Sequence, residues 1–250
     1  MCPNLSIRLT VRRGFSFLVC ALTLNLGLWQ FSIAKAPTAS KSQQNQPVSQ
    51  ELSEADKLFI ELRDAARKND VTRSGQLAAA LVNYPYTDYV RYFRIKPQLF
   101  DKGNEARADT ILDEEVYAFL RAYEGTAIAD RLRNDWLLVL GKRKDWPQFD
   151  KEYSLFMLDD DTNVKCYALQ SRLAKQEDPK RIGEDALKIM IDPRNFGSAC
   201  QELAPLLVQA KGLTISQAKA LGRAAAEMNL ETIGKRIGGD DPLATLVRSA

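Results

Sequence analysis

The sequence has no histidine and few cysteines, and both shortages exclude kinds of chemistry. Its 250 residues include four cysteines and not one histidine. Serine and cysteine triads of the usual form would therefore have no general base. Zinc would also lack its ligands, because histidine is absent and no two cysteines form a CxxC pair. The sequence predicts neither a metal site nor a cofactor.

Long apolar runs are also scarce, and the one that occurs lies near the N-terminus, at residues 15–31. Three arginines precede it, and Ala34, Lys35 and Ala36 follow as a small-x-small pattern. This order predicts a cleavable signal peptide at residues 1–36, cut near Ala36, and export to the periplasm. The chain would then meet a membrane only through the signal peptide. An uncleaved membrane anchor is the alternative.

Cleavage would change both the charge and the cysteine content. Four of the 35 basic residues and none of the 32 acidic residues lie at 1–36, so 31 basic residues would face 32 acidic ones, a net charge of −1 instead of +3. No basic domain would remain to favour nucleic acid. Cys2 and Cys20 would also leave, while Cys166 and Cys200 would stay in an oxidising compartment. We predict that these two form a disulfide, worth about 3–4 kcal/mol in chain entropy.

The remainder divides into a linker and a helical domain. Residues 37–50 are polar and contain proline, which predicts a flexible linker. Residues 51–250 show no long period-two alternation, and apolar residues recur instead at three- and four-residue spacing. We therefore predict an all-α fold, built as a superhelical array of short helical hairpins. Such an α-solenoid would be like a tetratricopeptide array without its strict consensus.

One hairpin, at residues 128–153, represents the repeated unit. The apolar residues of its first helix share one face: Ile128, Leu132, Trp136, Val139 and Leu140. Its polar residues are predicted to be exposed on the other side: Arg131, Arg133, Asn134 and Asp135. Gly141 is expected to end this helix in the left-handed conformation, and Asp145 to cap the next one. Elsewhere a helix is expected at 76–83, after Gly75, and Pro205 should kink or split the helix that Ser198 opens.

Tyrosines and carboxylates are the candidate binding or catalytic residues. Tyr84, Tyr86 and Tyr89 lie in one short stretch, and such rings can stack on sugars, although helical spacing favours core packing for the cluster. The run of aspartates at 159–161 lacks the ligand spacing of a calcium loop and indicates a solvated turn. The glutamates that a glycosidase could use are also predicted to be solvated: Glu114, Glu115, Glu124 and Glu152.

Four segments occur in an order that resembles the soluble lytic murein transglycosylases. They are YPYTDYVRYFRI, RLRNDWLLVLGKRKDWPQFDKEY, NVKCYALQSRLA and NFGSACQELAPLLV, and a signal peptide precedes them. The resemblance covers residues 53–250 and is to the N-terminal superhelical region of that family. It implies a ring of helical hairpins, contact with peptidoglycan glycan strands, and a place beside a lysozyme-like catalytic domain.

The catalytic signature of that family is missing. Its members cleave the MurNAc–GlcNAc bond with one glutamate, which is followed by serine, and release a 1,6-anhydro sugar. Neither this Glu-Ser pair nor the family's Gly-Leu-Met-Gln motif occurs in the sequence. No catalytic residue can be carried over, and the chain is expected to be incomplete at its C-terminus. We predict weak or no cleavage of peptidoglycan by this chain alone.

Two other functions remain open. A free-standing periplasmic helical-repeat adaptor would bind a protein partner in its groove and would end in a polar capping helix. Leu243, Leu246 and Val247 instead give the last expected helix an apolar face, which favours truncation. A sugar-binding module would require exposure of at least one of the three tyrosines named above.

Overall fold

The computed structural model describes residues 52–228 and 230–239, without the side chain of residue 231. These residues belong to one structural unit, Gln50–Ala250. Within them every regular element is a helix, and backbone pairing of the β type is limited to one isolated bridge between Phe100 and Ala106. The predicted all-α class is therefore confirmed for the described part of the chain.

Three predictions fall on residues that the structure does not describe. They are the signal peptide at 1–36, the linker at 37–50, and the apolar face of Leu243, Leu246 and Val247.

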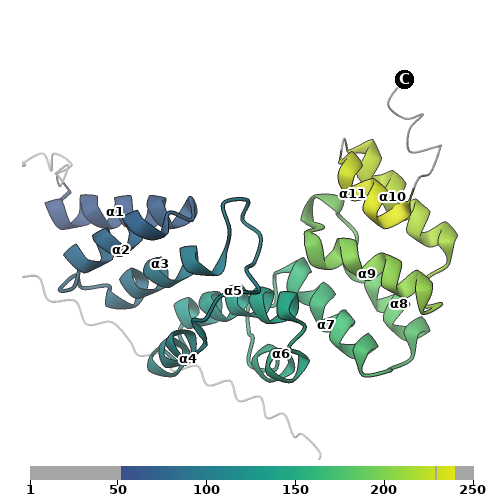
Figure 1. The fold of residues 1–250 in the computed structure, drawn as a ribbon, viewed down its shortest axis with the longest axis horizontal. Coiled ribbons are helices and arrows are strands. Elements are labelled where there is room, and N and C mark those ends of the chain that lie inside the picture. The colour runs from purple at the N-terminus through teal and green to yellow at the C-terminus, as the bar shows by residue number, and fades with distance from the viewer. Residues whose placement is uncertain (1–51, 229, 240–250) are drawn as a thin grey trace, which may run out of the picture. The chain divides into compact units, whose positions relative to one another are not determined.

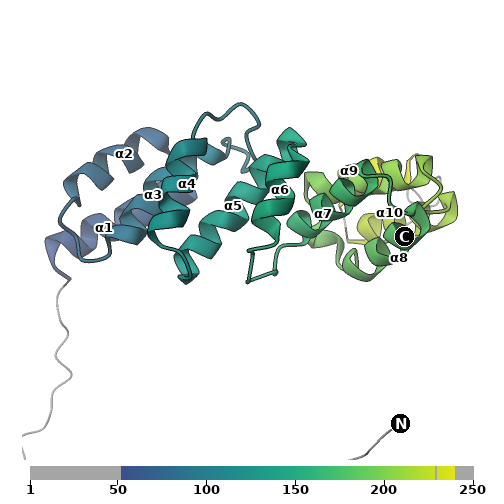
Figure 2. The same ribbon diagram turned by 90° about the horizontal axis from the view of Figure 1, so that it is seen from below.

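Eleven α-helices and one short 3-10 helix succeed one another along the described residues (Figure 1). They are α1 (Glu54–Arg67), α2 (Val71–Ala80), α3 (Thr87–Leu99), α4 (Asp113–Ala122), α5 (Ala127–Arg143), α6 (Trp146–Tyr153), α7 (Thr162–Ala174), α8 (Pro179–Ile189), η1 (Pro193–Asn195), α9 (Ser198–Gln209), α10 (Ile215–Glu227) and α11 (Glu231–Gly238). Helices that are near in sequence contact each other, such as α1 with α2, α5 with α6 and α10 with α11. The view turned by 90° shows the same order of neighbours (Figure 2).

Side-chain caps fix many of the helix starts. Ser53 and Asp56 form a capping box at α1, and Thr214 and Gln217 form another at α10. Single side-chain caps begin four helices of the middle region: Thr126 at α5, Asp145 at α6, Asp161 at α7 and Asp178 at α8. Each cap gives a partner to an amide that the helix itself leaves unpaired.

The helix start predicted at residue 76 is wrong, and of the kink or split expected at Pro205 the split is excluded. α2 begins at Val71, ahead of the expected residue 76, because the Asp70 side chain accepts a hydrogen bond from the Arg73 amide at 2.9 Å and caps the helix. Gly75 lies inside this helix. α9 runs through Pro205 without being split.

Gly141 does not end α5 either. The helix continues to Arg143, and Lys144 takes the left-handed conformation, with φ of 59°. A β-carbon at Gly141 would lie 2.3 Å from the ring of Tyr167, which belongs to α7. Glycine is therefore needed at this position because α7 packs closely against α5, and not because a helix ends there.

Burial of α5 on several sides is a further correction. The structure buries Arg133, Asn134 and Asp135, which were predicted to be exposed, and leaves Arg131 half-buried. The cause is that α3, α4, α6 and α7 all contact α5, so that both its apolar and its polar faces meet other helices. Helical spacing identified the apolar side correctly, with Trp136 fully buried.

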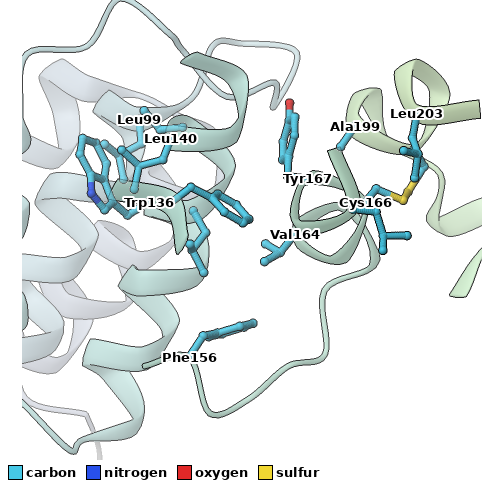
Figure 3. Close-up of a cluster of buried hydrophobic side chains, with 14 of the residues drawn as sticks. Leu99, Trp136, Leu140, Phe156, Val164, Cys166, Tyr167, Ala199 and Leu203 are labelled. Carbon is cyan, nitrogen blue, oxygen red and sulfur yellow. A yellow bond between two sulfur atoms is a disulfide. The ribbon is translucent and has the colours of Figure 1, made fainter. Parts of the chain in front are cut away.

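Buried hydrophobic side chains form two clusters. The N-terminal cluster joins α1, α2 and α3 and consists of Leu62, Ala65, Leu77, Ala78, Leu81, Tyr84 and Val90. The central cluster extends in sequence from Tyr92 to Ile237 and contains Trp136, Phe149 and Leu203. Figure 3 shows part of it, with the α5 side chains of Trp136 and Leu140 on one side and Cys166 and Leu203 on the other.

Candidate functional site

The three tyrosines considered as sugar contacts lie at the start of α3, in unlike surroundings. Tyr84 is buried, its ring stacks on Phe59 with 4.8 Å between centroids, and its hydroxyl donates to Asp56 Oδ1 at 2.7 Å. This hydrogen bond raises the pKa of Tyr84 to about 12. Tyr86 and Tyr89 are 59% and 40% exposed. Stacking on a sugar is therefore open to Tyr86 and Tyr89, whereas Tyr84 belongs to the core.

Cys166 and Cys200 form the disulfide that the sequence predicts. Their sulfur atoms are 2.03 Å apart, and the bond joins α7 to α9 across a sequence separation of 34. Both residues are completely buried in the central cluster. Their place there gives the bond a structural role.

Glu152 was predicted to be solvated, and the structure buries it. Arg133 Nε donates to Glu152 Oε2 at 3.2 Å, and Arg133 Nη1 donates to Asp130 Oδ1 at 3.1 Å. The Asp130 carboxylate also accepts from the amides of Met157 and Leu158, at 3.1 and 2.8 Å from its nearest oxygens. Arg133 thus faces two buried carboxylates, and the Met157 and Leu158 amides give Asp130 further partners and attach the segment after α6 to the first turn of α5.

The other candidate carboxylates lie nearer the surface. Glu114 and Glu124 are exposed, and Glu115 pairs with Arg94. The aspartate run forms a turn as predicted: Asp159 and Asp160 pair with Lys165 and Arg131, and Asp161 caps α7.

Asp135 is a second buried carboxylate, between α3 and α5. Burial raises its pKa above the ordinary 3.8, and Lys96, 3.8 Å away, opposes that rise. The Tyr92 hydroxyl donates to Asp135 Oδ2 at 2.9 Å. With partners on α3, this carboxylate links two helices.

A cleft of about 720 Å³ lies where the end of α5 meets α9 and α11; it is named the polar cleft after its charged and polar side chains, and Pro205 and Leu206 add an apolar part to its lining. Its polar lining consists of Lys142 and Lys144 from the end of α5, Ser198, Gln201 and Glu202 from α9, Arg236 from α11, and Glu105 from the loop after α3. Within it Lys142 Nζ lies 3.7 Å from Glu202 Oε1, and Arg236 Nη1 donates to Gln201 Oε1 at 2.9 Å. The cleft thus offers positive charges, carboxylates, an amide and a hydroxyl in one place.

This arrangement suits binding better than acid catalysis. A catalytic carboxylic acid needs an apolar site that raises its pKa. Glu202 is 43% exposed at its side chain and lies 3.7 Å from Lys142 Nζ, so it does not lie in such an apolar site. Hydrogen bonds and charge pairing are the chemistry that the cleft can supply.

No local sequence pattern predicted this cleft. Ser198, Glu202 and Arg236 gave no signal, because they come together only when α9 and α11 pack. Within residues 52–228 and 230–239, no group of three or more histidine, cysteine or acidic side chains could hold a metal ion. None of the helices in that part is long and apolar enough to span a bilayer.

Comparison with protein-family models, with curated proteins and with solved structures gives no match for this chain.

Proposed function

We propose that this chain is the superhelical, glycan-binding portion of a periplasmic soluble lytic murein transglycosylase, and that it binds peptidoglycan without cleaving it alone. The polar cleft carries this proposal. Peptidoglycan presents sugar hydroxyls, amides and the carboxylates of its stem peptides. A cleft that combines Lys142, Lys144 and Arg236 with hydroxyl and amide side chains complements those groups.

The helical arrangement supports the resemblance on which the proposal rests. The quoted segments lie on α3, on the α5–α6 hairpin, on α7 and on α9, so they follow one another through contacting helices. Contacts between helices that are near in sequence are those expected of a solenoid of hairpins. The disulfide between Cys166 and Cys200 fits an oxidising compartment such as the periplasm.

Sedimentation with purified murein sacculi tests the proposal. We expect the full chain to sediment with sacculi and to release no anhydro-muropeptides. The double variant Lys142→Gln, Lys144→Gln should weaken sedimentation about tenfold or more, because each lost charge-assisted contact is worth about 1–3 kcal/mol. Lys57→Gln, Lys68→Gln removes two charges from α1, far along the chain from the cleft, and is the matched control.

The outcomes are distinct. Equal loss in both double variants would point to general charge attraction and would remove the cleft from the proposal. Failure of the unaltered chain to sediment would overturn glycan binding. Release of anhydro-muropeptides would overturn the non-catalytic role.

A protein-binding adaptor is the second candidate, because a second hollow exists between α2 and α3. It encloses about 780 Å³ and is lined largely by small and apolar residues: Val71, Gly75, Ala78, Ala79, Val82 and Val90. Two of its valines are exposed: Val71, at the start of α2, is 43% exposed, and Val82, just after the end of α2, is 70% exposed. If sacculi do not retain the chain, a Val82→Asp variant tested against candidate periplasmic proteins becomes the decisive experiment.

A further inference from the structure

A small inner pocket adjoins the polar cleft. It measures about 60 Å³ and shares Glu105 and Ser198 with the cleft as lining residues. A single water needs only about 10–15 Å³ by this kind of measure, so a group of several non-hydrogen atoms can enter. The inner pocket is lined on its apolar side by Phe100, Ala106 and Leu138.

Tyr167 supplies an unused polar group to this pocket. The residue is 2% exposed, yet its hydroxyl makes no hydrogen bond of standard geometry with any described residue. Figure 3 shows the hydroxyl pointing away from Val164 and the buried cluster. Close contact with Gly141 holds the ring, and burial raises the pKa of the hydroxyl to about 12; the Ser198 side chain, which lies near the hydroxyl without a hydrogen bond of standard geometry, opposes the rise. A buried hydroxyl without a partner costs stability, so a ligand that bonds to it is favoured.

Asn163 adds a hydrogen-bond acceptor to the same pocket, and the start of α9 adds donors. Asn163 packs over Gly197, where a β-carbon would come within 2.1 Å of its side chain, and its Oδ1 has no partner among the described residues. α9 begins at Ser198, and Gly197 provides no side-chain cap, so the first amides of α9 keep their donors. The pocket therefore combines donors, one acceptor and an apolar wall.

We propose that the inner pocket binds the acetamido group of an N-acetylated sugar. The acetamido carbonyl accepts from the Tyr167 hydroxyl and the start of α9, its N–H donates to Asn163 Oδ1, and its methyl group packs on Phe100 and Leu138. An amide with an attached methyl group needs all three kinds of contact, whereas a hydroxyl or a carboxylate would leave Asn163 or the apolar wall unused. This inference rests on the proposed function for the origin of the sugar, a peptidoglycan strand.

The test compares two soluble oligosaccharides by calorimetry on the full chain. We expect the trimer of N-acetylglucosamine to bind, and the deacetylated glucosamine trimer to bind at least tenfold more weakly. Tyr167→Phe keeps the ring against Gly141 and should reduce binding of the acetylated trimer roughly tenfold, the usual value of one buried hydrogen bond. Tyr153→Phe, which removes a hydroxyl bonded to Asp159, is the matched control.

Gly197→Ala gives a second variant whose backbone is compatible with alanine, with φ of −74°. Its new methyl group displaces the Asn163 side chain towards the pocket and should abolish the preference for the acetylated trimer. Equal binding of both trimers, or unchanged binding in Tyr167→Phe and Gly197→Ala, would overturn the acetamido pocket. Sedimentation of the same variants with sacculi separates the two proposals, since strand binding through the cleft can persist when the inner pocket is wrong.

Discussion

The N-terminal cluster and the central cluster use different means to hold short helices together. In α1 and α2 the ionic contacts are at the surface, such as Arg73 with Glu61, whose side chains are 44% and 48% exposed. Around α5 the ionic contacts are buried: Arg133 is 9% exposed at its side chain, and its partner Glu152 is 6% exposed. Surface pairs contribute little, whereas removing one member of a buried pair is costly.

The difference shows how burial changes the role of a charge. A small three-helix cluster can leave its charges in water and rely on caps and apolar contacts. α5 lies among four helices, so its charged residues had to find partners inside the protein.

Removal of one buried charge should separate the two regions most clearly. Arg133→Met leaves Asp130 and Glu152 buried without their cation and should lower the free energy of unfolding by about 3–5 kcal/mol. Arg73→Met, its surface counterpart, should cost less than about 1 kcal/mol. Urea denaturation monitored by circular dichroism measures both. Similar small losses in the two variants would mean that burial does not increase the contribution of this network to the free energy of unfolding.

Loss of the disulfide should act on the central cluster alone. The double variant Cys166→Ala, Cys200→Ala opens a loop of 34 residues and should cost about 2–4 kcal/mol. Hydrogen exchange should become faster in α7, α8 and α9, while α1 and α2 should keep their rates because their buried side chains belong to the N-terminal cluster. Faster exchange throughout the chain would show instead that the two clusters unfold together.

Two glycines inside helices offer a matched pair. Gly141→Ala places a methyl group where the Tyr167 ring lies and should destabilise the protein by about 1–3 kcal/mol. Gly75→Ala meets nothing within 4 Å and should stabilise α2 by about 0.5–1 kcal/mol. Thermal denaturation should therefore shift in opposite directions. A stabilised Gly141→Ala variant would contradict the close approach of α7 to α5.

Acidification should change the free energy of unfolding in opposite directions through Asp56 and Asp135. The side chains of Ser53 and Tyr84 lower the pKa of Asp56. Its contribution to the free energy of unfolding is therefore present above the unfolded pKa and is lost as pH falls through the folded pKa. Burial raises the pKa of Asp135, so its contribution is present below 3.8 and is lost as pH rises through the folded pKa.

Asparagine variants isolate these two contributions. Below about pH 4, Asp56→Asn should reduce the loss of stability on acidification. Above about pH 4, Asp135→Asn should reduce the loss of stability on raising the pH. Free energies of unfolding measured along a pH series test both. The same slope in both variants would mean that neither carboxylate behaves as its surroundings require.

Local signals can predict where a helix starts, but they cannot predict contacts between helices. Asp145 could be recognised as the cap of α6 because a cap and the amide it bonds lie three residues apart. Gly141 and Glu152 were misjudged because their partners, Tyr167 and Arg133, come from other helices. A polar residue looks the same in sequence whether water or a buried counterion satisfies it.

The candidate site was beyond sequence analysis for the same reason. Lys142 and Lys144 were visible as cations at a helix end, but Ser198 and Arg236 reach them only through the packing of α9 and α11. The unused hydroxyl of Tyr167 becomes apparent only once its surroundings are known, since helical spacing predicts burial and not hydrogen bonding.

The bond between Cys166 and Cys200 also limits how far the chain can be stretched. An extended chain spans about 3.3–3.6 Å per residue, so a closed loop of 34 residues withholds roughly 110–120 Å of length from a chain pulled at its two ends. Helix α8 lies inside this loop and bears no tension until the bond is reduced. Helices α1 to α3 contain no cysteine and are drawn out by the same force without such a stop.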